Sequence, residues 1–417
     1  MTRFIRPTLL AGVAAAALLT SASARAATLV QCPGDTLGVG LIDKPDPNWP
    51  HAKCKSIAAG DGFITLGDGA VTYIFGFSDV TGTAPLDIAR TARFNANFAA
   101  PTIIMDEGDD FFLTLTNVGF ANRPDLFDPH TVHFHGFPNA MPVFDGEPEG
   151  SFGTNINNSF TFYYRPLNPG TYMFHCHQEA AEHMQMGMLG NLYVRPKQNK
   201  LADGTKFANN FIHHTNYTYA YNDADGSTLY DVEFPVQIEG FDPVFHKADQ
   251  GIQPPPFAIM RDSYAMINGR GYPQTINTAG PGQSATTPGA TTNPVDNSDH
   301  LSQPNSALIT ATKGQKVLLR ISSLDVQRFY TVSIPGIPMR VVGRGARIFR
   351  GGGEPTGTEM SYATSSVSLG GGESYDVILD TSTVAKGTYF LVTTNLNYLV
   401  NGATDDYGGL MTEIVIN

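Results

Sequence analysis

The stretch Gly170-Thr-Tyr-Met-Phe-His175-Cys176-His177 is the most informative part of this chain. The residues at 172–174 are apolar, and two of them are aromatic, which favours a β-strand. Successive side chains of a strand point to opposite faces of the sheet. Cys176 is therefore expected on one face together with Phe174, and His175 and His177 are expected on the other.

A second stretch, His130-Thr-Val-His133-Phe-His135-Gly136, divides in the same way. His133 and His135 share one face of the expected strand, whereas His130 lies on the opposite face. If the two stretches pair, Cys176 and His130 meet inside a sheet sandwich. Four imidazoles, those of His133, His135, His175 and His177, then lie together on the other side. The pattern predicts two metal sites back to back.

The side chains in these stretches favour copper over zinc. Six of the 11 histidines fall within residues 130–135 and 175–183, beside Cys176 and Met188. A thiolate with two imidazoles and a weak thioether is typical of blue copper. Zinc accepts cysteine and histidine ligands, but zinc explains neither Met188 nor a second group of four imidazoles.

The two motifs resemble the last domain of the multicopper oxidases and, more distantly, the first domain of the copper nitrite reductases. The resemblance implies an all-β chain of two cupredoxin-like Greek-key sandwiches. It implies a type 1 copper site and a type 2/type 3 site, linked by electron transfer through His175, Cys176 and His177. The implied type 1 ligands are His130, Cys176, His183 and Met188. The implied type 2/type 3 ligands are His133, His135, His175 and His177.

The sequence departs from the oxidase pattern at two points. Six residues separate Cys176 from His183, two more than is usual, so we expect a longer loop at residues 178–182. A trinuclear cluster also needs twice the four imidazoles that the motifs offer. Our hypothesis is that a second copy of the chain supplies the others, which implies a homo-oligomer. A mononuclear type 2 site completed by water or His246 is the alternative.

The second half of the chain repeats the first without its candidate ligands. Residues 330–336 answer to residues 130–136, and residues 387–389 answer to residues 170–172. We therefore predict a copper-binding domain at residues 27–199 and a copper-free copy at residues 205–417, with a low-complexity loop at about 278–306. Short alternating strands with frequent turns predict antiparallel sandwiches. Residues 28–100 show no clear periodicity and are expected to be irregular.

The N-terminal 26 residues have the pattern of a secretory signal peptide. Arg3 and Arg6 precede a short apolar run, and cleavage is expected after Ala26. The protein is therefore predicted to be periplasmic or secreted, with no membrane span. In an oxidising compartment Cys32 and Cys54 are candidates for a disulfide, but their spacing alone does not establish the bond.

The charge balance and the resemblance together limit the function. The chain has 38 acidic and 26 basic residues, which argues against a nucleic-acid partner. The resemblance implies a copper-dependent oxidoreductase that takes electrons from a phenolic, metal-ion or similar small donor and reduces dioxygen to water. A copper nitrite reductase-like enzyme is an alternative, although His133 stands where that family has a catalytic Asp. A non-catalytic copper or electron-transfer protein is another.

Overall fold

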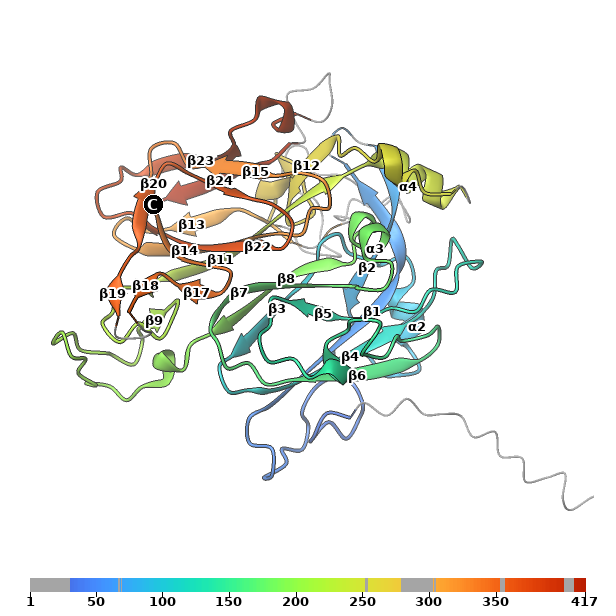
Figure 1. Ribbon diagram of the computed structural model, residues 1–417, viewed down its shortest axis with the longest axis horizontal. Coiled ribbons are helices and arrows are strands. Elements are labelled where there is room, and N and C mark those ends of the chain that lie inside the picture. The colour runs from blue at the N-terminus through green and yellow to red at the C-terminus, as the bar shows by residue number, and fades with distance from the viewer. Residues whose placement is uncertain are drawn as a thin grey trace, which may run out of the picture.

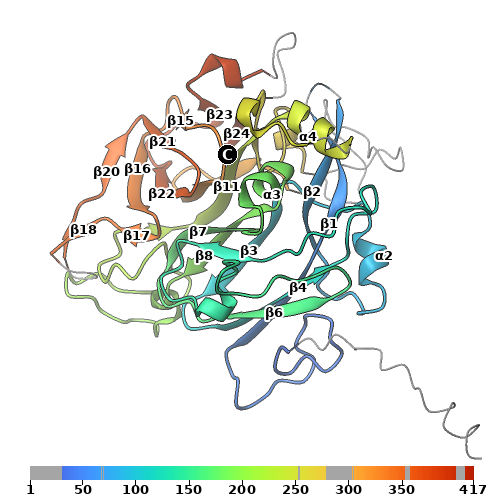
Figure 2. The same ribbon diagram turned by 45° about the vertical axis from the view of Figure 1, so that its right-hand side comes forward.

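The main sheets of this chain pack in two pairs, and each pair buries apolar side chains between its sheets. The two resulting β-sandwiches lie side by side (Figures 1 and 2). The computed structural model describes residues 31–66, 68, 70–251, 254–278, 303, 305–352, 357–400 and 409–417. The expected signal peptide and most of the expected loop at 278–306 lie outside the described residues. Among the described residues, no helix has the length and apolar character needed to cross a bilayer.

The first sandwich packs a sheet of order β2-β1-β4-β6 against a sheet of order β3-β8-β7-β5. Phe111, Leu113 and Leu115 line its core, as their alternation predicts. Its strands are β1 (Ala52–Thr65), β2 (Val71–Asp79), β3 (Ala100–Asp106), β4 (Asp110–Asn117), β5 (His133–His135), β6 (Ser159–Tyr164), β7 (Gly170–His175) and β8 (Leu189–Arg195). Its helices are α2 (Ile88–Ala92) and α3 (Ala180–Met186), with 3-10 turns at Pro142–Phe144 and Lys197–Lys200.

The expectation that residues 28–100 are irregular is wrong, because β1 and β2 form a long antiparallel hairpin. These strands contain alanine and glycine where β-branched residues are typical, so the pattern does not indicate strands. The small residues have a packing role. A Cβ on Gly76 would lie 2.3 Å from the carbonyl oxygen of Asn97, in the segment that crosses the hairpin. Glycine lets that segment pack directly on the sheet. Cys54 of β1 forms a disulfide with Cys32, with the two Cα atoms 6.0 Å apart.

The second sandwich packs a sheet of order β12-β11-β14-β22-β16-β17 against a sheet of order β13-β24-β23-β15-β21. In the main sheets its strands are β11 (Val232–Phe241), β12 (Tyr264–Ile267), β13 (Ile309–Ala311), β14 (Lys316–Ser323), β15 (Tyr330–Ser333), β16 (Met339–Arg344), β17 (Arg347–Ile348), β20 (Tyr362–Thr364), β21 (Ser366–Leu369), β22 (Glu373–Asp380), β23 (Gly387–Thr393) and β24 (Met411–Ile416). Around them lie β9 (Thr218–Tyr219), β10 (Leu229–Tyr230), β18 (Arg350–Gly351), β19 (Thr358–Glu359), helix α4 (Pro243–Gln250) and 3-10 turns at Phe257–Ile259, Gln274–Ile276 and Leu396–Tyr398.

Strand pairing repeats between the two sandwiches. In the first, β5 pairs with β7 so that His133 lies opposite His175. In the second, β15 pairs with β23 so that Ser333 lies opposite Val392. These are the residues that the internal sequence repeat makes equivalent. Each sandwich also contains parallel pairs, such as β1 with β4 and β11 with β14, so the sheets are not purely antiparallel as expected. The boundary between the units at residues 199–205 stays a prediction.

A buried polar network joins β7 of the first sandwich to β14 and β22 of the second. Arg320 is fully buried, and its guanidinium contacts Glu233 at 2.8 Å and Asp376 at 3.1 Å. Asp376 also accepts a hydrogen bond of 2.5 Å from Thr171 of β7. The Ser374 hydroxyl donates to the Thr171 carbonyl at 2.6 Å. Arg320 therefore neutralises two buried carboxylates at the junction, which keeps the strand that carries His175 against the second sandwich.

We expect Arg320→Met to destabilise the protein by about 3–5 kcal/mol, because the substitution leaves Asp376 buried without a counter-charge and leaves Glu233 with Arg195 alone. Denaturant unfolding followed by fluorescence measures the effect. Arg340→Met is the matched control, since Arg340 pairs with Glu359 at the surface and such pairs contribute about 1 kcal/mol or less. Equal losses in the two variants would contradict a special role for the buried network.

Candidate metal centre

The short ladder between β5 and β7 sorts the candidate ligands onto two sides. His133 lies opposite His175, and His135 lies opposite Met173, so these four side chains share one face. Phe134 and Phe174 form the intervening pair and point into the core of the first sandwich. Cys176 follows β7 by one residue and belongs to that same core cluster. The structure thus has the alternation that the sequence pattern predicts.

Inside the sandwich, two imidazoles converge on the Cys176 thiol. The Cys176 Sγ lies 3.2 Å from Nδ1 of His183 and 3.9 Å from Nδ1 of His130. All three side chains are buried. The backbone N–H of Thr131 also points at the sulfur, at 3.4 Å. His130, Cys176 and His183 thus form a group whose ligand atoms are close enough to one another to hold a single metal ion.

His183 reaches this group from helix α3 rather than from the expected loop. The additional residues between Cys176 and His183 form the first turn of α3. This helix begins directly after Glu179, whose backbone has a left-handed conformation. Met188 is fully buried just beyond the helix. Its carbonyl accepts a hydrogen bond from the Cys176 backbone at 3.0 Å, and its N–H donates to the His183 carbonyl at 2.8 Å. The backbone thus fixes Cys176, His183 and Met188 relative to one another.

Burial determines the protonation of these three side chains. It lowers the pKa of His183 to about 4 and brings the pKa of His130 well below its usual value. Both rings are therefore neutral and keep a lone pair for a metal. Burial also raises the pKa of the Cys176 thiol to about 11, and a bound cation reverses that effect by stabilising the thiolate. A soft thiolate with two imidazole nitrogens is a donor set that fits copper.

On the other face, three imidazoles form a second group with ligand atoms in reach of one metal ion: His133, His135 and His175. The Nδ1 of His133 donates to the Asp145 carbonyl at 2.7 Å, and the Nδ1 of His175 donates to the Cys176 carbonyl at 2.9 Å. With the proton on Nδ1, each ring has its Nε2 lone pair free for a metal. The Nε2 of His175 lies 3.4 Å from Nδ1 of His135.

His177 lies beside this group, and its side chain is 33% exposed, against 17% for that of His133. Its ring centroid is 4.9 Å from that of His133. Its Nδ1 contacts a carboxylate oxygen of Glu147 at 2.9 Å, and its backbone N–H donates to the Thr131 hydroxyl. Thr131 therefore contacts both sides of the ladder, through its N–H to Cys176 and through its hydroxyl to His177. Sequence reasoning did not single out Thr131, although its place inside the motif is a usable signal.

The second sandwich of the same chain covers part of the face that carries the four imidazoles. A Cβ on Gly372 would lie 2.7 Å from Nε2 of His135. Met173 packs against Leu324 in a small buried cluster. The face is open instead toward His133 and His177, where Glu147 is partly exposed.

The other described histidines of the second half do not join either group. The His213 Nδ1 contacts the Tyr219 hydroxyl, and His214 contacts Asp203. Both ring nitrogens of His246 face backbone carbonyls, those of Tyr73 at 2.6 Å and Gln185 at 2.9 Å. The alternative in which His246 completes a mononuclear site is therefore wrong. His300 lies outside the described residues.

The outer edge of His183 faces carboxylates. Its Nε2 is buried without a hydrogen-bond partner among the described residues, 4.0 Å from an Asp128 oxygen and 3.9 Å from a Glu179 oxygen. Asp128 and Glu179 are more exposed than His183. This edge therefore connects the buried Cys176 group to an acidic surface.

We expect Gly372→Ala to destabilise the protein by about 1–3 kcal/mol more than Gly314→Ala. Both glycines have positive φ, +84° and +100°, so both substitutions impose a similar backbone cost of about 1–2 kcal/mol. Only the Cβ at position 372 collides with His135, because nothing lies within 4 Å of a Cβ at position 314. Denaturant unfolding and the number of copper ions retained per chain measure the difference. Identical behaviour of the two variants would contradict contact between Gly372 and His135.

Two family models match this chain. Both describe a multicopper oxidase; one matches residues 81–199 and the other matches residues 246–409. Together they cover more than half of the chain and overlap both sandwiches.

Curated relatives match less than a third of the chain. Multicopper oxidase MCE from Talaromyces pinophilus is 35% identical over 120 residues, which are 28% of this chain and 18% of that protein. Laccase abr2 from Aspergillus fumigatus is 30% identical over 133 residues, 31% of this chain and 21% of that protein. The matched region thus spans about a fifth of the length of these relatives.

Solved structures match most of the chain at low sequence identity. Blue Copper Oxidase from Nitrosomonas europaea has a TM-score of 0.58 and 20% identity, covering 87% of this chain and 85% of that chain. Copper nitrite reductase from the same organism has a TM-score of 0.53 and 15% identity, covering 87% and 93%. These similarities confirm the all-β fold of two cupredoxin-like sandwiches, the second without the candidate copper ligands. The chain belongs to the multicopper oxidase family, and membership implies copper as the metal.

Proposed function

We propose that this protein is an exported copper-dependent oxidase that takes electrons one at a time from a small donor and reduces dioxygen to water. The donor is a phenol, a metal ion or a similar one-electron reductant. Two ligand groups of different chemistry on opposite sides of the β5–β7 ladder are the observation that carries the proposal.

His130, Cys176 and His183 are the proposed ligands of a type 1 copper, with Met188 as a weak fourth ligand. Their convergence on one buried sulfur supports this assignment. His133, His135, His175 and His177 are the proposed ligands of a type 2/type 3 site. Copper bound by a thiolate and imidazoles exchanges single electrons, which is the chemistry required to link a one-electron donor to dioxygen.

The chain's own contribution is to connect, orient and insulate the two groups. His175 and His177 flank Cys176 in the sequence, so a few covalent bonds link the sulfur to both outer imidazoles. The carbonyls of Asp145 and Cys176 hold protons on the Nδ1 atoms of His133 and His175, which orients their rings. Phe75 and Phe120 pack beside His183 and His130 and exclude water from the sulfur.

Electron donors are proposed to approach the edge of His183 that faces Asp128 and Glu179. The Nε2 of His183 has no hydrogen-bond partner among the described residues. Once small movements expose this atom, it can form a hydrogen bond with an electron donor. The two carboxylates favour donors that carry positive charge or release a proton on oxidation.

A second copy of the chain is proposed to complete the type 2/type 3 site, which requires a homo-oligomer. The covering of His135 by Gly372 leaves His133 and His177 as the side from which additional imidazoles would approach. Export to the periplasm or the medium is supported by the Cys32–Cys54 disulfide, since such bonds persist in oxidising compartments.

His175→Ala is expected to lower oxygen consumption by at least about a hundredfold while the blue absorption remains, because it removes a ligand from the outer group alone. Cys176→Ser is expected to abolish the blue absorption as well. Absorption spectra and oxygen uptake with a phenolic dye and with Cu(I) measure both effects.

His214→Ala is the matched control, since this exposed histidine belongs to neither group. It should leave colour and oxygen uptake unchanged. A slow rate that is the same before and after His175→Ala would identify a non-catalytic copper carrier instead. Turnover of nitrite without oxygen uptake would identify a reductase.

A further inference from the structure

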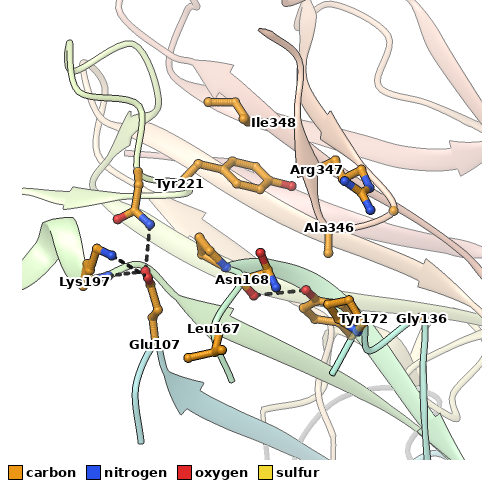
Figure 3. Close-up of a pocket in the computed structure, with 14 residues that line it drawn as sticks. Glu107, Gly136, Leu167, Asn168, Tyr172, Lys197, Tyr221, Ala346, Arg347 and Ile348 are labelled. Atoms are coloured by element: carbon orange, nitrogen blue, oxygen red, sulfur yellow. Dashed lines mark hydrogen bonds and ion pairs between the residues drawn. The ribbon is translucent and has the colours of Figure 1, made fainter. Parts of the chain in front are cut away.

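A cavity of about 340 Å³ lies at the junction of the two sandwiches (Figure 3). Its first-sandwich side is formed by the segment from Leu167 to Tyr172, together with Glu107. Its second-sandwich side is formed by Tyr221 and the hairpin of β16 and β17. The volume is within the range of about 300–1,000 Å³ that is usual for small-molecule sites.

The hairpin holds one wall of the cavity in place. Gly345 and Ala346 form its two-residue turn, both with positive φ (57° and 54°), between the paired residues Arg344 and Arg347. Ala346 is buried in the core of the first sandwich, and a Cβ on Gly170 would lie 2.6 Å from its Cα. The turn therefore packs tightly against the first sandwich, and Arg347 directly follows Ala346, the residue that makes this contact.

Two polar groups of the cavity have no partner in the part of the chain that the structure describes. Arg347 and Asn168 are both exposed, and neither the guanidinium nor the side-chain amide makes a hydrogen bond or ion pair there, whereas the neighbouring Arg344 pairs with Glu373. The one acid of the lining, Glu107, is already satisfied. It contacts the Lys197 ammonium at 3.1 Å and accepts a hydrogen bond of 2.7 Å from Asn222. The lining thus carries a net positive charge in a chain of formal charge -12.

The remaining lining is apolar and partly aromatic. Figure 3 shows Arg347 on the second-sandwich side, across the cavity from Tyr172 and Asn168. The Tyr172 hydroxyl donates to the Asn168 carbonyl at 3.0 Å, and the Tyr221 hydroxyl donates to Asp376. Both tyrosines therefore use their polar ends elsewhere, and because Tyr172 is 3% and Tyr221 2% exposed, only the edges of their rings reach the cavity. Leu167, half exposed at 52%, adds apolar surface at the rim.

We propose that this cavity binds a small aromatic carboxylate, such as a benzoic acid. The Arg347 guanidinium forms a bidentate pair with the carboxylate, and the ring lies against Leu167 and the ring edges of Tyr172 and Tyr221. A bare inorganic anion would leave the Leu167 side chain exposed to water, and a neutral aromatic would lack the charged pair with the guanidinium. The proposal is independent of the copper chemistry, because the lining contains none of the candidate metal ligands.

The test uses 4-fluorobenzoate and the full chain, with calorimetry and fluorine NMR to measure binding. We expect saturable binding that is the same in copper-loaded and copper-depleted protein. Arg347→Gln is expected to weaken binding by at least about tenfold, as loss of a charged hydrogen-bonded pair implies. The affinity of Arg347→Lys should lie between those of the unaltered protein and Arg347→Gln, because a lysine keeps the charge but loses the planar guanidinium. Leu167→Ala should weaken binding severalfold through lost apolar contact.

Lys386→Gln is the matched control, since it removes one positive charge outside the cavity and should change binding by less than about twofold. Fluorobenzyl alcohol and sulfate should bind at least about tenfold more weakly than fluorobenzoate. If sulfate binds as tightly as fluorobenzoate, the ring does not contribute to binding and the proposal of an aromatic ligand is wrong. If the alcohol binds as tightly, Arg347 does not recognise the carboxylate and that assignment is wrong. Absence of binding, or binding unaffected by Arg347→Gln, would refute the site.

Discussion

Side chains leave a β-strand in alternate directions, and this constraint determines what the first sandwich can do. Because β5 and β7 pair with His133 opposite His175, one face of the ladder collects imidazoles while the other directs Phe134, Phe174 and Cys176 into the core. A shift of register by one residue would place the sulfur among the outer imidazoles and remove it from His130 and His183. The two ligand groups therefore depend on the same few hydrogen bonds of one short ladder.

The second sandwich repeats the framework without the ligands and takes a structural part. Gly372 packs against His135, and the buried network around Arg320 holds Thr171 at the start of β7. His246 of α4 contacts the carbonyl of Gln185 in α3, the helix that carries His183. A repeat that contains none of the candidate ligands thus supports the strand and the helix that present them, which gives a physical reason for its presence.

The parts of the structure that follow from local alternation were predictable from sequence. The strand at 170–175, the facing of Cys176 and His175, and the register of the repeat all depend on a period of two. The β1–β2 hairpin was not predictable, because its alanines and glycines reflect the crossing of the segment near Asn97, a contact distant in sequence. Spacing alone left the Cys32–Cys54 pair open for the same reason. Helix α3 differs from the expected loop because residues 180–182 form a helical turn, which the spacing of Cys176 and His183 does not predict. The approach of Gly372 to His135 has no local signal at all.

The hydrogen bonds to the histidine rings also determine the proton balance of metal uptake. His133 and His175 hold their protons on Nδ1 against carbonyl oxygens, so ligation through Nε2 displaces no proton from either ring. The buried Cys176, in contrast, must release its thiol proton before it can ligate. Filling of the inner group therefore becomes more favourable as the surroundings become more alkaline, whereas these two outer rings take up metal without acidifying the medium. In the proposed copper sites, occupancy of the inner group thus depends on pH through a thiol proton that the rings of His133 and His175 have no counterpart for.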